Sequence, residues 1–198
     1  MSELPATAPG AEVPWTLPSR GRVGMFSLIA GETAIFTIFI VAYIFYIGKS
    51  LSGPSPRQVL EVPIFNTVCL LSSSLTIHVA VRALQRGKIT AFNVSWFLTL
   101  ILGAIFLIDT GREWHRLIDR AGLTITTNLF GTTYYSLVGL HAFHVSVGLL
   151  GLGLVMVLSL ASRVTPQNAD RVDVFSLYWH FVDAVWLAVF TVVYVVGR

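Results

Sequence analysis

The sequence predicts an all-α, polytopic membrane protein, a bundle of five transmembrane helices. Only 12% of its 198 residues are charged, whereas a soluble domain typically carries about 25%. Hydrophobic residues make up 55%, the mean hydropathy is +0.75, and these residues gather in five long runs. Each run is near or above the ~20 residues that cross a hydrocarbon core. Because the runs are apolar on every face, they exclude transmembrane strands, which alternate polar and apolar residues.

The organisation along the chain is simple. Residues 1–22 are rich in Pro, Ala and Thr and lack an apolar h-region, so we expect a disordered N-terminal tail and not a signal peptide. Residues 23–198 form the five-helix membrane domain. The expected helices run at about 23–48, 62–84, 92–116, 129–161 and 172–197. The fourth is longer than the hydrocarbon needs, so it should tilt or protrude.

The charge pattern also favours a membrane protein. The net charge is +3, but the basic residues stand at the ends of apolar runs, which is typical of membrane-flanking charge and not of nucleic-acid binding. They divide between the two sides as seven and six of the 13, so charge alone does not set the orientation. An odd number of helices places the termini on opposite sides. The single cysteine, Cys69, lies in an apolar run and is expected to be a buried structural thiol.

Glu32 is the clearest ionisable residue at membrane depth. Such a group costs at least ~2.5–3.5 kcal/mol in a bilayer, so each one is a functional hypothesis. Phe36 and Phe39 follow one and two turns later, and this apolar surrounding disfavours the ionised carboxylate. One interpretation is a proton relay or a contact with lipid headgroups. The other is a neutral carboxyl that is hydrogen-bonded to a neighbouring helix.

The second predicted helix is rich in small polar residues. Asn66 and the run of serines near Ser74 favour close packing and interhelical hydrogen bonds. His78 lies one turn beyond Ser74, and we expect it to be bonded within the bundle.

The fifth predicted helix carries a polar stripe at Ser176, His180 and Asp183. A His–Asp pair one turn apart can share a proton and relieve the cost of burial. A proton path is one interpretation, and a satisfied structural pair is the favoured one.

His141 and His144 stand at positions i and i+3 of the fourth predicted helix. Two imidazoles on one face can bind a metal or a haem, but a metal site normally needs three or four ligands. No carboxylate or cysteine flanks this pair, so hydrogen-bonded packing is the favoured interpretation. No nucleophile with a base, phosphate-binding loop or metal-ligand cluster is recognisable. We therefore predict no catalytic residue and no metal site in this chain.

Five segments, one for each predicted helix and in matching order, resemble cytochrome c oxidase subunit III. The closest is YWHFVDAVWL in the fifth helix. GTTYYSLVGLHAFHVSVG in the fourth is similar to the family's Gly-Ser-Thr-Phe-Phe and His-Gly-x-His-Val segments, with Ala142 in place of glycine. The first helix has Gly31 before Glu32 where the family usually has serine. In LGAIFLIDTGREW of the third, Glu113 matches and Thr110 replaces the usual glutamine. The second, VPIFNTVCLLSSSLTIHVA, resembles the family's Pro, Asn-Thr and Leu-Leu-Ser-Ser segment.

The resemblance implies a non-catalytic subunit of a haem-copper terminal oxidase in aerobic respiration. It implies no haem or copper in this chain, with those cofactors in partner subunits I and II, and bound phospholipid in clefts. It also implies support of oxygen access and proton uptake, and a place in the cell inner (plasma) membrane with a cytoplasmic N-terminus and the C-terminus on the opposite side. Glu32 matches the family's membrane-buried glutamate, and His180 and Asp183 match its Trp-His-Phe-Val-Asp segment. Longer members have seven helices, of which this chain resembles the last five, so we expect the family's lipid cleft to be lost or completed by another subunit.

Three alternatives stay open. The chain can be subunit III of a quinol oxidase, or the related small subunit of nitric oxide reductases. An interpretation from a different class is a free-standing haem or ion carrier that uses His141 and His144.

Overall fold

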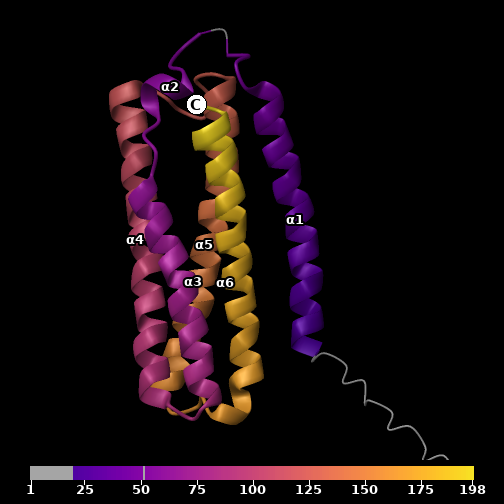
Figure 1. The fold of residues 1–198 in the computed structure, drawn as a ribbon. Coiled ribbons are helices and arrows are strands. Elements are labelled where there is room, and N and C mark those ends of the chain that lie inside the picture. Colours follow the sequence, from indigo (N-terminus) through magenta and orange to yellow (C-terminus); the bar gives the residue numbers. More distant parts are fainter. Residues whose placement is uncertain (1–19, 51) are drawn as a thin grey trace, which may run out of the picture.

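A computed structural model describes residues 20–50 and 52–198 of the chain. Its five long helices are α1 (Arg20–Tyr46), α3 (Ile64–Gln85), α4 (Ile89–Ala121), α5 (Leu129–Leu160) and α6 (Ala169–Phe190) (Figure 1). Five helical segments are long and apolar enough to cross a membrane, the last one running from Pro166 to Val196. The described residues contain no strand. The predicted all-α bundle of five spanning helices is therefore confirmed.

Some helix boundaries differ from the expected ones. Helix α1 begins at Arg20, inside the stretch expected to be a tail, and the rest of that stretch lies outside the described residues. Helix α4 extends past the predicted range of 92–116 at both ends. Polar contacts one turn apart, such as that of His115 with Asp119 at 2.7 Å, support its polar last turns. It ends at Gly122, whose φ of 61° is a left-handed conformation that suits glycine.

Three short elements were not expected from the sequence. Helix α2 (Pro56–Val59) lies in the connection after α1, and a 3-10 turn, η1 (Pro166–Asn168), precedes α6. A π-helical turn, η2 (Thr191–Val196), continues α6 towards the C-terminus.

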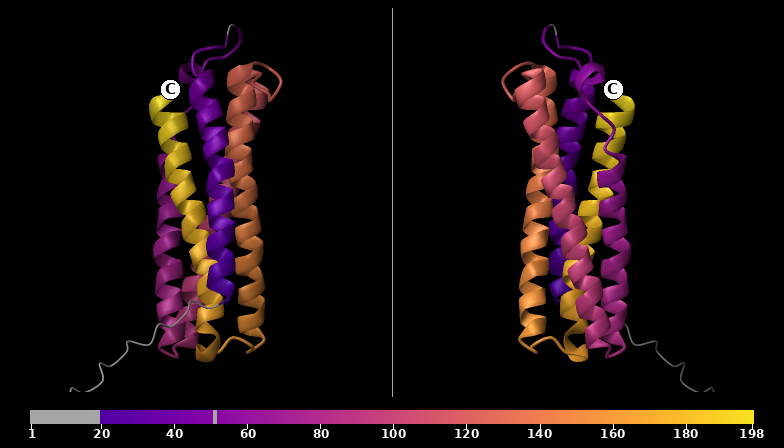
Figure 2. Two further views of the ribbon diagram at one scale, coloured as in Figure 1. Left: turned by 90° about the vertical axis from the view of Figure 1, so that its right-hand side faces the viewer. Right: turned by 90° about the vertical axis from the view of Figure 1, so that its left-hand side faces the viewer.

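Helices α3, α4, α5 and α6 form a closed four-helix ring, in which each helix packs against two neighbours of the ring. Helix α1 lies outside this ring and packs on α5 and α6 (Figures 1 and 2). At its first turn, a guanidinium nitrogen of Arg22 lies 2.6 Å from Oδ2 of Asp173 in α6. The first residues of α1 and the C-terminus lie at opposite ends of the bundle (Figure 1).

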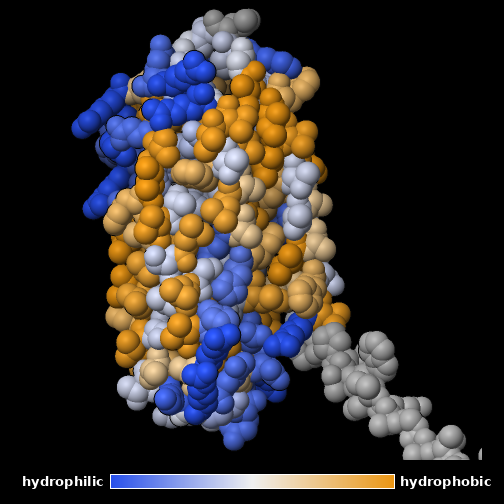
Figure 3. All heavy atoms as spheres, viewed as in Figure 1, coloured by the Kyte–Doolittle hydropathy of each residue, from blue (hydrophilic) through white to orange (hydrophobic). Residues whose placement is uncertain are grey.

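The surface of the bundle is suited to lipid. Figure 3 shows a broad hydrophobic band between hydrophilic ends. Helix α1 has only two buried residues, Phe36 and Tyr43, and its other large apolar side chains are largely exposed. A soluble protein rarely exposes such contiguous apolar surface, so this band is expected to face hydrocarbon or other subunits.

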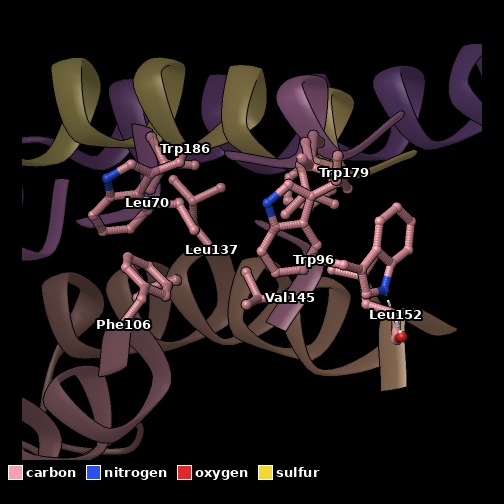
Figure 4. Packing of buried hydrophobic residues seen from close by; sticks show 14 of the residues in the cluster. Leu70, Trp96, Phe106, Leu137, Val145, Leu152, Trp179 and Trp186 are labelled. Carbon is pink, nitrogen blue, oxygen red and sulfur yellow. Dashed lines mark hydrogen bonds between the residues drawn. The ribbon is translucent and has the colours of Figure 1, made fainter. Parts of the chain in front are cut away.

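The indole of Trp179 is the central packing element of the ring. It is fully buried, and a Cβ placed on Gly103 of α4 or Gly148 of α5 would lie within 2.8 or 2.9 Å of its ring atoms. Only glycine at these two positions allows the backbones of α4 and α5 to approach the indole of Trp179 this closely. A hydrogen bond joins α4 directly to α5, because Nε1 of Trp96 donates to the carbonyl of Leu152 at 2.9 Å (Figure 4). The predicted buried thiol is confirmed, since Cys69 of α3 is buried and free.

The glycine contact with Trp179 yields a stability prediction. We expect Gly103→Ala to lower stability by about 1–3 kcal/mol, because overpacking a rigid, buried ring forces neighbouring atoms to shift. Gly111→Ala on the same helix is the matched control, since no atom of a neighbouring element lies within 4 Å of the place that its Cβ would take. Thermal unfolding in detergent measures both variants. Equal melting temperatures for the two would contradict the role assigned to this contact.

Candidate functional site

Two tryptophans of α6 donate hydrogen bonds to small polar residues of α3. Nε1 of Trp179 donates to Oγ of Ser73 at 2.8 Å, and Nε1 of Trp186 donates to Oγ1 of Thr67 at 3.1 Å. Interhelical hydrogen bonds of this kind average about 0.6 kcal/mol in membrane proteins. The sequence predicted that this helix is rich in small polar residues, and the structure shows which of them bond to α6.

Ser74 of α3 bridges His180 and Asp183 of α6. Its Oγ lies 2.8 Å from Nδ1 of His180 and is also hydrogen-bonded to Oδ2 of Asp183. The predicted direct sharing of a proton between His180 and Asp183 is therefore wrong. Both side chains point from one face of α6 towards α3, and the serine stands between them.

The bridge permits two proton arrangements. A hydroxyl has one proton, so when Ser74 donates to an ionised Asp183, Nδ1 of His180 must donate to Ser74. When Asp183 is protonated and donates to Ser74, the serine donates to His180 instead. The other carboxylate oxygen of Asp183, Oδ1, is buried and has no hydrogen-bond partner among the described residues. This group therefore serves mainly to connect two helices, with one acceptor left unsatisfied.

Glu32 of α1 is hydrogen-bonded to His144 of α5. Oε2 of Glu32 lies 3.0 Å from Nε2 of His144, and the two side chains are 22% and 7% exposed. The ring of Phe36 covers the imidazole at 4.9 Å between centroids. The pair joins residues 112 positions apart, which no periodicity in the sequence could reveal.

The contacts of His144 fix how many protons the pair holds. Its Nδ1 lies 2.8 Å from the carbonyl oxygen of Leu140, and because a carbonyl only accepts, Nδ1 must carry a proton. One further proton then lies between Nε2 and Oε2. It belongs either to a neutral carboxyl or to an imidazolium beside a carboxylate. Both forms leave the pair with no net charge, which reduces the cost of its burial.

The second predicted histidine, His141, has a different environment. It is fully buried, and neither ring nitrogen has a hydrogen-bond partner among the described residues. It is stacked on Trp186 at 5.0 Å and meets Phe106 edge to face at 5.7 Å. The predicted hydrogen-bonded packing is therefore wrong for His141, which is held by aromatic contacts instead.

Glu113 of α4 forms a third buried polar group. Its Oε1 accepts hydrogen bonds from Tyr134 of α5 at 3.3 Å and from Tyr194 of η2 at 3.2 Å. Tyr194 was missed by sequence reasoning, because it lies in the last turn of an apolar run. Glu113 also lines a cleft of about 850 Å³ beside the start of α3.

Two predicted polar contacts are not formed in the described part of the chain. The amide of Asn66 is buried against the same cleft and makes no side-chain hydrogen bond there. His78 is exposed and makes no hydrogen bond among the described residues, so its predicted bonding within the bundle is wrong. It lies one turn after Ser74 on the same side of α3, but its side chain is not enclosed by the neighbouring helix.

The predicted polar residues do not assemble into one centre. Glu32 with His144, Glu113 with its tyrosines, and His180 with Asp183 are three separate sites. Within residues 20–50 and 52–198, no group of three or more His, Cys, Asp or Glu residues is placed to hold a metal ion. Both nitrogens of His144 are engaged, so it offers no free lone pair to a metal in this conformation.

Comparisons with known proteins agree with this architecture. The profile of the family "Cytochrome c oxidase subunit III" matches residues 19–198. Cytochrome c oxidase subunit 3 of Alkalihalophilus pseudofirmus is 33% identical over 185 residues, which is 92% of this chain and 90% of the relative. Its counterpart in Bacillus subtilis is 30% identical, covering 96% and 94% of the two chains. Cytochrome bo(3) ubiquinol oxidase subunit 3 of Pseudomonas aeruginosa is 33% identical, covering 88% and 84%.

The fold and these matches define a multi-pass membrane subunit of a haem-copper oxidase, which is an oxidoreductase assembly. The chain belongs to the cytochrome c oxidase subunit III family. The resemblance seen in the five sequence segments is thereby confirmed.

The serine bridge yields a prediction about assembly. We expect Asp183→Ala and Ser74→Ala each to destabilise the docking of α6 by about 1–3 kcal/mol, because the first removes a hydrogen bond between α6 and α3 and the second leaves the buried Asp183 without a partner. The double variant should cost less than the sum of the two, since the residues share one contact. Ser72→Ala, at an exposed position of α3, is the control. Thermal unfolding and single-turnover oxidation are measured on the complex. Normal assembly of Asp183→Ala with sharply slowed oxidation would indicate a direct catalytic role instead.

Proposed function

We propose that this chain serves a cytochrome c oxidase by holding a proton-exchanging carboxyl, Glu32, beside the catalytic subunit. The observation that carries the proposal is the Glu32–His144 pair, in which a single proton lies between a half-buried carboxyl and a buried imidazole. The same subunit is proposed to bind phospholipid and to border the route of oxygen. The exposed apolar side chains along α1 and α3 support contact with lipid acyl chains.

The geometry favours Glu32 as the member that exchanges protons with its surroundings. Nδ1 of His144 is hydrogen-bonded to a backbone carbonyl, and a carbonyl cannot take up a proton. The imidazole therefore cannot pass a proton on to a further group. Glu32 is the more exposed of the two and has a second carboxyl oxygen. Protons would therefore enter and leave through the carboxyl, while His144 positions it and stabilises either of its protonation states.

The proposed partners are the catalytic subunit I and subunit II, which would hold the haem and copper cofactors. The chain itself is proposed to carry no redox centre. Its proposed place is the plasma membrane, with a cytoplasmic N-terminus and the C-terminus opposite. Nucleic acid is not among the proposed partners. In place of the family's first two helices, another subunit or lipid would cover α1, whose outer side is largely exposed.

A quinol oxidase is the second candidate, because one of the similar proteins is named a ubiquinol oxidase subunit. The small subunit of nitric oxide reductases is a more distant option. Other subunits bind the electron donor, so an assay of the purified complex is needed to distinguish the candidates. Oxidation of reduced cytochrome c and a dinuclear copper site would support the first candidate, and oxidation of ubiquinol without that copper site would support the second.

Replacing Glu32 tests the proton role. Glu32→Gln keeps the volume and the hydrogen bond to His144 but cannot release a proton. We expect the complex to assemble normally, to release fewer protons per electron or to inactivate sooner during turnover, and to reduce oxygen initially at an unchanged rate. Proton release and activity over many turnovers are measured beside the wild type.

Glu61→Gln is the matched control, because it makes the same chemical change in an exposed carboxyl whose only described ion pair is with Arg116, at 3.2 Å. It should behave as the wild type. Identical curves for Glu32→Gln and the wild type would leave Glu32 a structural carboxyl and would refute the proposal.

Purification tests the proposed role as a subunit. From mild detergent we expect this chain to co-purify with a haem-copper catalytic subunit, and the isolated chain to show no Soret band. A stoichiometric Soret band in the isolated chain would favour the free-standing haem carrier.

A further inference from the structure

A basic pocket opens over the turn between α3 and α4. It has a volume of about 320 Å³ and is lined by Arg82, Arg86, Lys88, Val79, Ala83 and Ala91. The three cationic side chains are exposed, and none of them forms an ion pair with a described carboxylate. No acidic residue lines the pocket.

Two arginines beside the largest-volume cleft described, at the opposite end of the bundle, are paired with carboxylates of the same chain. Arg112 lies 3.1 Å from Asp109, and Arg116 lies 3.2 Å from Glu61, both beside the cleft at the opposite end. The basic pocket differs from that cleft, because its three cations have no ion-pair partner among the described residues.

Helix electrostatics do not explain the position of Lys88. Arg82 and Arg86 stand at the C-terminal end of α3, where a cation complements the helix dipole. Lys88, however, is the N-cap of α4, where the dipole is positive and a cation is unfavourable. It makes no side-chain capping bond. A bound anion at this turn would compensate both the lysine and the free amides of the first turn of α4.

The pocket continues into apolar surface. Its own apolar lining includes Val79 of α3 and Ala91 of α4. One turn further towards the membrane centre, Leu75 and Val94 are 66% and 65% exposed. A basic pocket next to exposed apolar surface suits a ligand that combines an anionic head with hydrocarbon chains. It suits free phosphate or an acidic peptide less well.

We propose that the basic pocket binds the headgroup of an anionic phospholipid. The lipid phosphate lies among Arg82, Arg86 and Lys88, and the acyl chains extend along the side of the α3–α4 pair past Leu75 and Val94. Basic pockets between transmembrane helices are a recurrent way to select anionic lipids. The proposal deepens the phospholipid binding put forward under the proposed function by naming one site and one class of lipid, and it does not depend on the role of Glu32 or on the electron donor.

The test uses the intact oxidase complex, delipidated in mild detergent and titrated with phosphatidylglycerol. For Arg82→Gln/Arg86→Gln/Lys88→Gln we expect about 100-fold weaker binding, since each cation contributes about fivefold. Lipid analysis before delipidation should find about one anionic lipid fewer per complex. The matched control is the triple variant Arg20→Gln/Arg163→Gln/Arg171→Gln. It removes the same charge from exposed cations at the same end of the bundle that lie outside the pocket, so it should bind the lipid as the wild type does.

Two further variants and three further controls complete the experiment. Lys88→Gln alone should weaken binding about fivefold, which covers the case that the triple variant does not assemble. Arg82→Lys/Arg86→Lys should retain binding. Equal loss in both triple variants, equal binding of phosphatidylcholine, or displacement by millimolar inorganic phosphate would each overturn the proposal. Loss of a co-purifying subunit with retained lipid would also overturn it, by assigning the pocket to a protein contact.

Discussion

The hydrogen bonds between α3 and α6 are the interaction on which the rest of the bundle depends. In a bilayer, lipid is as apolar as the helix surfaces, so close packing and polar contacts decide how helices dock. Trp179 meets both requirements, because its nitrogen bonds Ser73 while its ring lies against Gly103 and Gly148. Once α6 is fixed in this rotation, Asp183 must face Ser74. The four-helix ring then offers one outer surface, on α5 and α6, to α1.

The docking of α1 depends on few contacts. Only Phe36 and Tyr43 of this helix are buried, and it is joined to the ring by Arg22 with Asp173 at one end and by Glu32 with His144 near its middle. Because apolar side chains can slide along one another at little cost, such polar contacts fix the register. Glu32 therefore has a structural role as well as its proposed exchange of protons. Its replacement by glutamine separates the two, since the hydrogen bond is kept and only the transferable proton is lost.

The cleft at one end of the bundle and the basic pocket at the other differ in how their charges are paired. Beside the cleft at the start of α3, arginines are paired with carboxylates of the same chain. At the α3–α4 turn the cations have no such partners in the described structure, and they border exposed apolar surface. Charge that a chain leaves uncompensated at a membrane boundary attracts a counter-charge from its surroundings, and there the abundant anions are lipid headgroups.

The sequence by itself determined the five helices, because long apolar runs in lipid must satisfy their backbone groups internally and only helices do so at this length. It also singled out Glu32, His144 and Asp183, since a polar residue in an apolar run is conspicuous. Only the tertiary structure decided their partners. Glu32 bonds a histidine 112 positions away, Ser74 separates His180 from Asp183, and His141 has no hydrogen-bond partner in the described structure. These outcomes depend on the rotation of each helix about its axis, and runs that are apolar on every face carry almost no signal for it.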